Sequence, residues 1–532
     1  MESANPSNLL PTPIRVDKLR PLLYRYHDHD YVLNGLVHGF NLDYEGDYFS
    51  QRCNNNLSVN TNPEVALSKV MGEVRKGRIA GPFDSPPLPF FRCSPLSLRE
   101  KSTPGQFRLL HNLSYPHNNS SVNSNIPRRC TKTEYATFDD AVDIINSYDS
   151  PFLAKTDIAE AFRLIPLHPS NYSLTGFKLD GHYYYDRCLP MGASSSCLIF
   201  ERFSDAIVFI LKTRYLVKHI VKVLDDFLFI AETYESCLGA LIAFKHLSGI
   251  INLPIAHHKT EGPTHVLTFL GIQLDTELGI VSIPRNKIIP YTEAITTAIA
   301  GKKLTLRDLR SLTGKLAFVS QIIPVGRCFL RRLYDLTIGI SRPSSSIKLP
   351  EGAILDLKVW LDFLANYNAR ELYASKLPAP LSRRFTTDAT PRGYGAHFQG
   401  SYFYGCFPDA WNHLDIQAKE FYPIFVLVSL LAPELQNTTI TMVTDNMSVM
   451  HAINSQTSRN KYIMSLLRRF VLVLLKNNIA CTAEYIESRN NLISDALSRL
   501  QLPTALQAIR DSGFHPSVIS IPSSLRPNNL TI

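Results

Sequence analysis

Residues 223–230, VLDDFLFI, place two adjacent carboxylates, Asp225 and Asp226, inside an apolar run. Burying a negative charge costs free energy unless a partner compensates it. One interpretation is a plain tight turn, because Asp favours turns and the run can fold into a hairpin at the Asp pair. The other is a hairpin whose turn holds metal ions. These eight residues leave both interpretations open, so the rest of the chain must decide between them.

The chain has 532 residues, too many for one hydrophobic core, which predicts about two to four domains. Hydrophobic residues make up 45% and charged residues 19%, as in ordinary globular proteins. The net charge of +9 suits a polyanionic partner. Much of the excess is local, because residues 302–332 contain eight Lys or Arg against one acidic residue, Asp308. This pattern predicts a basic surface on that segment.

The nine cysteines are scattered and form no CxxC pair, which argues against a zinc site or a disulfide framework. We therefore expect a reduced, intracellular protein, with cytoplasm and nucleus both open. The N-terminus has no apolar signal region, and the longest apolar stretch, residues 425–432, is too short to span a bilayer. We expect no membrane association.

Local patterns divide the chain into five segments. An amphipathic helix is predicted over residues 305–321, with Thr305 and Asp308 in a capping arrangement, and a second helix is predicted to start within 327–337. The sequence SRPSSS at 341–346 indicates a linker. The predicted segments are 1–95, 96–280, 281–375, 380–500 and a flexible tail at 501–532.

A third acid is placed to join the Asp pair. In SPFLAKTDIAEAF, residues 150–162, a short apolar strand ends at Asp157. An Asp at a strand end and an Asp pair at a neighbouring hairpin would converge, and three hard oxygen ligands would suit Mg²⁺. Two such ions can clamp the attacking and leaving oxygens of an in-line phosphoryl transfer. The metals would then compensate the buried acids.

Six segments, in order and at matching spacing, resemble reverse transcriptases. They are LSLREKSTPGQFRLLHNLSYP (96–116), KTDIAEAF (155–162), LPMGASSSCLIFERF (189–203), VLDDFLFI (223–230), HHKTEGP (257–263) and LTFLGIQL (267–274). The resemblance implies fingers and palm over 96–280, a helical thumb or connection over 281–375, and Asp157, Asp225 and Asp226 as ligands for two Mg²⁺ ions, with Mn²⁺ as an alternative. The chain departs from many relatives at Val223, where an aromatic residue is common.

The resemblance also implies residues that contact the nucleotide. Phe162 would gate the sugar and favour dNTPs over ribonucleotides, with plain core packing as the alternative. Lys101 and Arg108 would hold the triphosphate, although Arg99 can take the place of Lys101. Met191 and Gly192 would line the nucleotide and template pocket. Lys259 would protonate the leaving pyrophosphate, or is instead a solvated surface lysine.

A second set of acids follows in a strand-rich unit near 384–500. Asp388 lies near the end of a predicted strand, Glu420 near the start of a helix, Asp445 at the end of a strand, and Asp495 at the opening of a helix. Any one of them alone is explained by a helix cap or a surface charge. Together, in a β-β-β-α-β-α order, they resemble ribonuclease H, as do TDATPRGYGA (387–396) and NLISDALSR (491–499).

That second resemblance implies that Asp388, Glu420, Asp445 and Asp495 bind two metal ions for hydrolysis, with water as the nucleophile. Tyr394 replaces a common Trp, and no histidine lies between residues 452 and 514, which puts the family's histidine-assisted product release in doubt. PTPIRVDKLRPLL (11–23), GRIAGPFDSPP (77–87) and residues 309–336 resemble, more narrowly, the polyproteins of DIRS-type retrotransposons, whose tyrosine recombinase would be encoded elsewhere or missing.

The sequence therefore predicts an α+β multidomain chain, a right-hand polymerase with fingers, palm and thumb, followed by a ribonuclease H-like α/β domain. The expected function is RNA-directed DNA polymerase with ribonuclease H activity. The expected partners are an RNA template, a DNA primer, the RNA–DNA hybrid and dNTPs, with the oligomeric state open. The alternatives are a catalytically inactive nucleic-acid-binding descendant and an RNA-dependent RNA polymerase, against which Phe162 and the nuclease-like segment argue.

Overall fold

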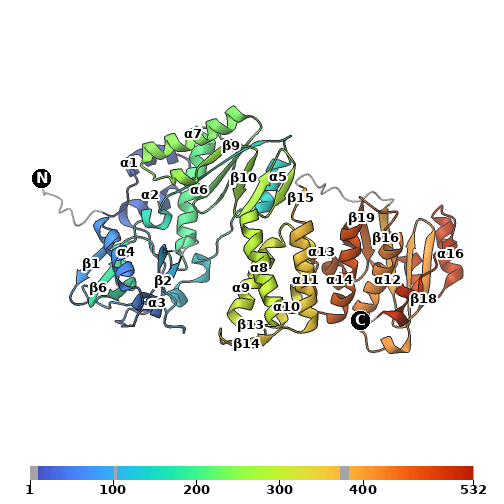
Figure 1. Ribbon diagram of the computed structural model, residues 1–532. Coiled ribbons are helices and arrows are strands. Elements are labelled where there is room, and N and C mark those ends of the chain that lie inside the picture. The colour runs from blue at the N-terminus through green and yellow to red at the C-terminus, as the bar shows by residue number, and fades with distance from the viewer. Residues whose placement is uncertain (1–9, 101–104, 372–382, 531–532) are drawn as a thin grey trace. The chain divides into compact units, whose positions relative to one another are not determined.

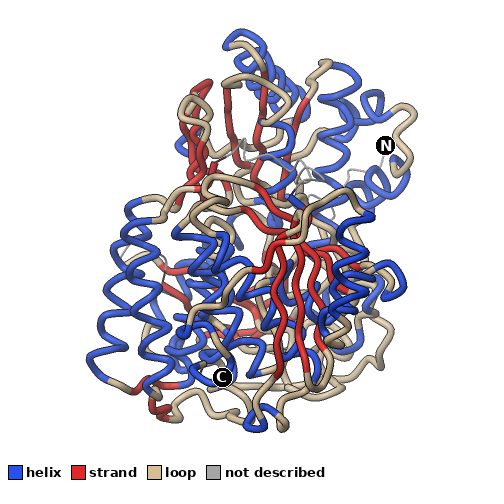
Figure 2. Tube along the Cα trace, turned by 90° about the vertical axis from the view of Figure 1, so that its right-hand side faces the viewer, coloured by secondary structure: helices blue, strands red, loops and turns tan. Residues whose placement is uncertain are grey.

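The computed structural model describes residues 10–100, 105–371 and 383–530. The chain forms two compact units, Met1–Gly279 and Ile280–Ile532. Figure 1 labels their helices and strands, and Figure 2 colours them by type.

The sheet that carries the Asp pair has the order β7-β8-β4-β9 and is antiparallel throughout. Its strands are β4 (Phe152–Asp157), β7 (His219–Val223), β8 (Asp226–Ala231) and β9 (Glu261–Thr264). The predicted hairpin is confirmed, because β7 and β8 pair directly and only Leu224 and Asp225 connect them. Phe227 and Phe229 of β8 pack against Phe244, which fixes the hairpin in the core.

Helices of the first unit pack on this sheet or on one another. They are α1 (Val16–Leu19), α2 (His29–His38), α5 (Phe138–Ile145), α6 (Ser196–Arg214) and α7 (Tyr234–Ile251). Helix α7 packs on β4, β8 and β9, and α6 packs on α7. Ten residues of α6 are buried. Helix α6, which precedes the Asp hairpin, is therefore a core element. Its Glu201 accepts a hydrogen bond from the hairpin turn.

Smaller sheets complete the first unit. Strands β1 (Ile79–Phe83), β6 (His182–Asp186) and β5 (Gly176–Leu179) form one sheet, β2 (Leu96–Glu100) and β3 (Phe107–His111) form a hairpin, and β10 (Val266–Phe269) pairs with β11 (Ile272–Asp275). Helices α3 (Leu57–Asn60) and α4 (Pro63–Arg75) pack on β2 and on β1 and β3, respectively.

The second unit begins with helices. They are α8 (Arg285–Gly301), α9 (Leu306–Val319), α10 (Arg331–Asp335) and α11 (Glu351–Asn366), with short strand pairs β12 (Ile280–Ser282) with β15 (Arg370–Glu371) and β13 (Lys303–Thr305) with β14 (Ser346–Lys348). The predicted cap of α9 is confirmed, because the Thr305 side chain accepts a hydrogen bond from the Asp308 N–H at 3.1 Å. The predicted second helix is shorter than expected, since 324–329 form a 3₁₀ helix.

The interpretation of residues 341–346 as a boundary with few contacts across it is wrong. Within the second unit, the Cys328 thiol lies 2.9 Å from the Gln456 carbonyl oxygen, and Asp356 of α11 pairs with both Arg332 and Arg468. Ser and Pro dominate the segment locally, but elements on both sides of it pack together. The helices at 285–366 and the later sheet therefore form one compact unit.

A six-stranded sheet carries the second set of acids, in the order β20-β19-β16-β17-β18-β21. Its strands are β16 (Arg384–Ala389), β17 (Gly393–Phe398), β18 (Ser401–Cys406), β19 (Thr439–Thr444), β20 (Ala480–Tyr485) and β21 (Ser517–Val518). Strands β16, β19 and β20 are parallel, whereas β17 is antiparallel to both of its neighbours. Figure 2 shows these strands as one fan.

The helices of this sheet are α12 (Ile416–Leu431), α13 (Met447–Ser455), α14 (Lys461–Lys476), α15 (Leu492–Ser498) and α16 (Leu502–Asp511). Helix α12 packs on α14, β16 and β17, whereas α15 packs on α16, β16 and β17. The predicted tail at 501–532 contains α16, which buries Ala505 and Ile509, and β21, which pairs with β18.

The predicted α+β multidomain fold class is confirmed, because the chain forms two compact units and each of them combines helices with β-sheets. All nine cysteines are free. Across the described ranges, no helix has the length and apolar character needed to cross a bilayer.

Candidate active sites

The first candidate site lies at one end of the β7-β8-β4-β9 sheet. Asp157 is the last residue of β4, and the strand register sets it opposite Asp226, the first residue of β8. Asp225 is in the turn, and its carbonyl oxygen accepts the Ile158 N–H at 3.0 Å. Leu224 has φ +55°, a left-handed conformation that is unfavourable for a leucine. The predicted convergence of Asp157 with the Asp pair is therefore present in the strand pairing.

A buried ion pair supports this turn. Glu201 of α6 accepts hydrogen bonds from the Leu224 N–H at 3.1 Å and from the Lys222 ammonium at 2.5 Å. Lys222 also pairs with Asp205 at 2.9 Å. Both Glu201 and Lys222 are buried, so the pair holds the turn from inside the core. Sequence reasoning missed it, although an acid among the apolar residues of α6 was a usable signal.

In the first site, in addition to the effect of burial, neighbouring acids raise the pKa values of Asp225 and Asp226. Burial, and then the charge of Asp157, raise the pKa of Asp225. Burial and a hydrogen bond with Asp157 raise the pKa of Asp226 to about 7. The Lys259 ammonium donates to Asp157 Oδ2 at 2.6 Å, and although burial opposes it, this bond raises the pKa of Lys259. A cation of the chain thus compensates part of the negative charge.

Two of the predicted nucleotide contacts, Arg108 and Lys259, interact with the acids of this site. Arg108 is exposed on β3, and its charge partly opposes the rise in the pKa of Asp225, which places it within electrostatic reach of that acid. The register sets Arg99 opposite Arg108. Lys101 lies outside the described residues. Lys259 contacts Asp157, so it is a part of the site and not a free surface lysine.

Phe162, Met191 and Gly192 belong to two further segments of the first unit. Phe162 lies in a 3₁₀ helix, Ala161–Leu164, half-buried, with its ring centroid 5.4 Å from that of Phe200. Met191 is 48% exposed and lines, with Arg108, a cavity of about 460 Å³. A Cβ at Gly192 would lie 1.7 Å from the His111 carbonyl oxygen, so only glycine fits there.

The second candidate site brings three acids from three elements together. Asp388 lies on β16, Glu420 on α12, and Asp445 directly follows β19. One carboxylate oxygen from each lies within 4.8 Å of the others. In the part of the chain that the structure describes, no other group of three His, Cys, Asp or Glu meets this limit, and the acids of the first site do not.

Burial and crowding raise the pKa values of two acids of the second site. Burial, followed by the charges of Asp388 and Asp445, raises the pKa of Glu420 to about 9, and burial raises that of Asp388 to about 6. Glu420 Oε2 is buried without a hydrogen-bond partner. Hard oxygen donors that crowd one another and include an unpartnered atom are the donor set that Mg²⁺ prefers. The residues present therefore fit a divalent cation.

The fourth predicted acid, Asp495, is not one of the three converging acids. It accepts two hydrogen bonds from the Arg499 Nε, at 2.8 and 3.0 Å, although its charge still raises the pKa of Asp388 and Glu420. Sequence reasoning missed Arg499, whose i,i+4 spacing from Asp495 was a usable signal. It also missed Ser498, which donates to Asp388, and Ser488, which donates to Asp445 at 2.6 Å.

Comparison with known proteins agrees with the geometry of the first site. Residues 107–274 match the family model "Reverse transcriptase (RNA-dependent DNA polymerase)". This match contains Asp157, Asp225, Asp226, Phe162 and Lys259. It ends before the second unit begins, so it says nothing about the second site.

Curated relatives are viral polyproteins. The putative enzymatic polyprotein of Cassava vein mosaic virus is 22% identical over 379 residues, which are 67% of this chain and 54% of that protein. The Gag-Pro-Pol polyprotein of Simian retrovirus SRV-2 is 24% identical over 50% of this chain and 14% of its own length. Protein P of Duck hepatitis B virus is 26% identical over 37% of this chain and 28% of its own length. The chain therefore spans about half of the first relative and less than a third of the other two.

Among solved structures, the foamy viral protease-reverse transcriptase in complex with RNA/DNA hybrid covers 83% of this chain and 56% of its own, at 15% identity and a TM-score of 0.48. The same protein in complex with dsDNA covers 89% and 97%, at 16% identity and a TM-score of 0.47. Together with the strand-end carboxylates, the family match over residues 107–274 leads to one conclusion: this chain contains a reverse transcriptase domain.

Proposed function

We propose that this protein is an RNA-directed DNA polymerase that also degrades the RNA of an RNA–DNA hybrid. The observation that carries the polymerase activity is the register that sets Asp157 opposite Asp226, with Asp225 in the turn between the strands. The family match over residues 107–274 supports it. The proposed substrates are dNTPs, an RNA template and a DNA primer. The proposed domains are fingers and palm at 96–280, thumb or connection at 281–375, and nuclease at 380–500.

Asp157, Asp225 and Asp226 would hold Mg²⁺, or Mn²⁺ in its place, because they offer hard oxygen donors. The raised pKa values of Asp225 and Asp226 support this proposal, since a cation would compensate their charges. When bound, two such ions supply charge neutralisation at the reacting phosphoryl group. Phe162 excludes a 2′-hydroxyl from the sugar position. Arg108 binds the triphosphate, and Lys259, protonated and bonded to Asp157, stands beside the acids as a proton donor.

The nuclease activity is a second proposal, and a separate observation favours it. The oxygens of Asp388, Glu420 and Asp445 converge within 4.8 Å, and Glu420 Oε2 lacks a partner. These three acids, with Asp495 beside them, would hold the metal ions for hydrolysis of a phosphodiester. Ser498 and Ser488 orient two of the carboxylates through their hydroxyl groups.

The basic residues of the second unit are proposed to bind the duplex. Exposed cations line the segment that precedes and includes α9 and the 3₁₀ helix after it: Lys302, Lys303, Arg307, Arg310 and Arg327. Contacts from such residues to phosphates are independent of sequence and weaken as salt rises. Raising salt should therefore reduce affinity for hybrids of any sequence equally.

Primer extension on an RNA template, with and without Mg²⁺, tests the polymerase proposal. The protein should extend the primer only with the metal, and Asp225→Asn should stop extension, because it removes one ligand charge. Asp84→Asn is the matched control, since Asp84 is fully exposed and lies outside the proposed site. If the purified, folded protein binds the hybrid but never extends the primer, it is instead a catalytically inactive, nucleic-acid-binding descendant.

We also propose that the chain comes from a DIRS-type retrotransposon. The support is the likeness of residues 11–23, 77–87 and 309–336 to that group. The expectation is a tyrosine recombinase reading frame close to this gene. An integrase reading frame in its place would contradict the assignment.

A further inference from the structure

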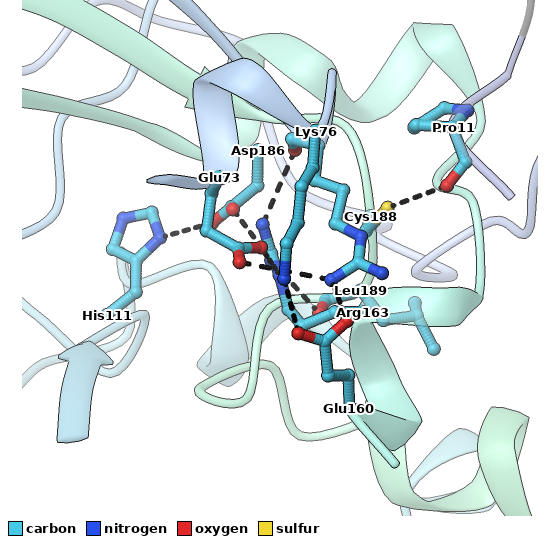
Figure 3. A network of polar contacts seen from close by, with 10 residues as sticks. Pro11, Glu73, Lys76, His111, Glu160, Arg163, Asp186, Cys188 and Leu189 are labelled. Atoms are coloured by element: carbon cyan, nitrogen blue, oxygen red, sulfur yellow. Dashed lines mark hydrogen bonds and ion pairs between the residues drawn. The ribbon is translucent and has the colours of Figure 1, made fainter. Parts of the chain in front are cut away.

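A network of ion pairs joins Glu73, Arg163, Asp186 and His111 in the first unit (Figure 3). The Arg163 guanidinium donates from Nε to Glu73 Oε2 at 2.9 Å and from Nη1 to Asp186 Oδ1 at 2.8 Å. The other Asp186 oxygen lies 3.0 Å from His111 Nδ1, and His111 Nε2 lies 3.3 Å from the Gly176 carbonyl oxygen. The network therefore joins α4, the 3₁₀ helix 161–164, β6 and the end of β3.

Two members of this network, Arg163 and Asp186, stay charged in spite of burial. The side chains of Arg163 and Asp186 are 13% and 6% exposed. Burial alone would raise the pKa of Asp186, but Arg163 and His111 outweigh it and lower the value. Burial likewise opposes the charge of Arg163, yet Asp186 and Glu73 raise its pKa. A charged guanidinium with two carboxylate partners has a fixed orientation, because its planar donors match their acceptors in one geometry.

A second ion pair holds the chain just before Phe162. Glu160, at φ +57°, accepts from Arg78 Nη1 at 2.6 Å and also pairs with Lys76. Burial would raise the pKa of Glu160, but Lys76 and Arg78 lower it, so it too is ionised. Phe162 therefore lies between two anchored residues, Glu160 and Arg163.

The network also reaches the other proposed nucleotide contacts. Arg163 Nη1 lies 3.5 Å from the Leu189 carbonyl oxygen, two residues before Met191. His111 ends the strand that carries Arg108, and its own carbonyl oxygen is what a Cβ at Gly192 would meet. Arg163, Asp186 and His111 line the cavity of about 460 Å³ that Arg108 and Met191 also line.

We propose that Arg163 is a positioning residue that sets the discrimination between dNTPs and ribonucleotides. It acts through the segments that carry Phe162 and Met191 and does not touch the nucleotide. This inference rests on the proposed polymerase function. A merely structural Arg163 would affect folding alone, whereas a positioning Arg163 alters the choice of sugar in protein that remains folded.

Two variants and one control test this role. Arg163→Lys keeps the charge but loses the planar fork. Glu73→Gln removes one charged acceptor at a side chain that is 24% exposed, where folding tolerates the change better. The control is Arg202→Lys. Arg202 also donates two hydrogen bonds to one carboxylate of the same unit, Asp28, at 2.6 and 2.5 Å. Asp28 is not one of the proposed nucleotide contacts.

The experiment is single-nucleotide primer extension by the full chain on an RNA template, with kcat and KM for one dNTP and for the matching ribonucleotide. Arg163→Lys should raise KM for the dNTP and reduce discrimination roughly tenfold, as expected when reacting groups are misplaced. Glu73→Gln should also raise KM for the dNTP and reduce discrimination, but by less than Arg163→Lys does. Arg202→Lys should leave the discrimination between the dNTP and the ribonucleotide unchanged. Thermal unfolding is recorded for each protein.

If both network variants lower the unfolding temperature or kcat but keep the wild-type ratio, Arg163 is structural and the inference is wrong. If Arg163→Lys does not fold, Glu73→Gln decides by the same criterion. Absence of extension by the unaltered protein has a different meaning, because it overturns the proposed polymerase and this inference with it.

Discussion

The two sets of acids solve the same electrostatic problem in different ways. At the first site, a hairpin and its neighbouring strand bring Asp157, Asp225 and Asp226 together, and Lys259 bonds to Asp157 at 2.6 Å. At the second site, three separate elements bring Asp388, Glu420 and Asp445 within 4.8 Å, and one Glu420 oxygen has no partner.

The difference shows what each site requires. At the first site, Lys259 compensates part of the negative charge of the acids through its bond to Asp157. At the second, the pKa of Glu420 is raised to about 9, so a proton compensates the charge when no metal is bound. Stability at the second site should therefore depend on pH and on divalent cations more strongly than at the first.

The largest expected effect is the loss of hybrid cleavage, with DNA synthesis retained, when one acid of the second site is replaced. Asp388→Asn should reduce hybrid cleavage by at least about 1,000-fold, the scale seen when one member of a catalytic unit is removed. DNA synthesis should continue, because Asp388 lies in the other unit. Cleavage of a labelled RNA strand measures the loss, with the exposed Asp409→Asn as control. Loss of synthesis together with cleavage would contradict two separate sites.

The next prediction is that helix α11 stabilises the part of the second unit that carries the second site, through the ion pair of Asp356 with Arg468. A fragment 380–500 lacks Asp356 and leaves Arg468, whose side chain is 11% exposed, without that partner. Leaving a buried charge unpaired costs about 3 kcal/mol, so the fragment should unfold at lower denaturant than a fragment 280–530. Arg468→Leu in the short fragment should recover part of the loss. Equal free energies of unfolding for the two fragments would show that α11 does not support α14.

A third prediction concerns the sugar, which only the first site should discriminate. Phe162→Ala should raise ribonucleotide incorporation relative to dNTP about tenfold, because the ring no longer excludes the 2′-hydroxyl. Competitive primer extension measures the ratio, and Phe90→Ala, at an exposed ring, is the control. An unchanged ratio would mean that Phe162 only packs against Phe200.

The last prediction concerns how the stability of the second site depends on pH. Because folding raises the pKa of Glu420, its contribution to stability is complete below about pH 4.5 and is lost as the pH rises toward about 9. The slope is at most about 1.4 kcal/mol per pH unit. Mg²⁺ should offset this loss at pH 8, and Glu420→Gln should abolish both the slope and the offset.

Thermal unfolding at pH 6 and pH 8, with and without Mg²⁺, measures this dependence. Glu434→Gln, at an exposed glutamate that follows the same helix, is the control. A Glu420→Gln protein that Mg²⁺ still stabilises as much as the wild type would remove Glu420 from the metal site.

Local patterns could predict the elements that carry the acids. The apolar runs on both sides of Asp225 and Asp226 indicated a hairpin, and β7 and β8 form it. Thr305 and Asp308 marked the start of α9. Alternation and helical periodicity are short-range signals, so they survive in a single sequence.

Long-range contacts could not be predicted in this way. Arg163 and Glu73 are 90 residues apart, and no spacing rule connects them. The Asp356–Arg468 pair across the predicted linker is equally non-local, which is why residues 341–346 suggested a boundary. The tail was predicted from its Ser and Pro content, although Ala505 and Ile509 share a buried helix face there. The convergence of Asp388, Glu420 and Asp445, in contrast, follows from the resemblance to ribonuclease H, although Asp495, which that resemblance also implies, is not one of the three converging acids.

One measurement tests the central claim of two independent carboxylate sites most directly. An RNA template and a DNA primer, each with its own label, are incubated with Mg²⁺ and with wild-type, Asp225→Asn or Asp388→Asn protein. The wild type should extend the primer and cut the template, Asp225→Asn should only cut, and Asp388→Asn should only extend. If either variant retains both activities, or if one substitution removes both from folded protein, the assignment of one reaction to each site is contradicted.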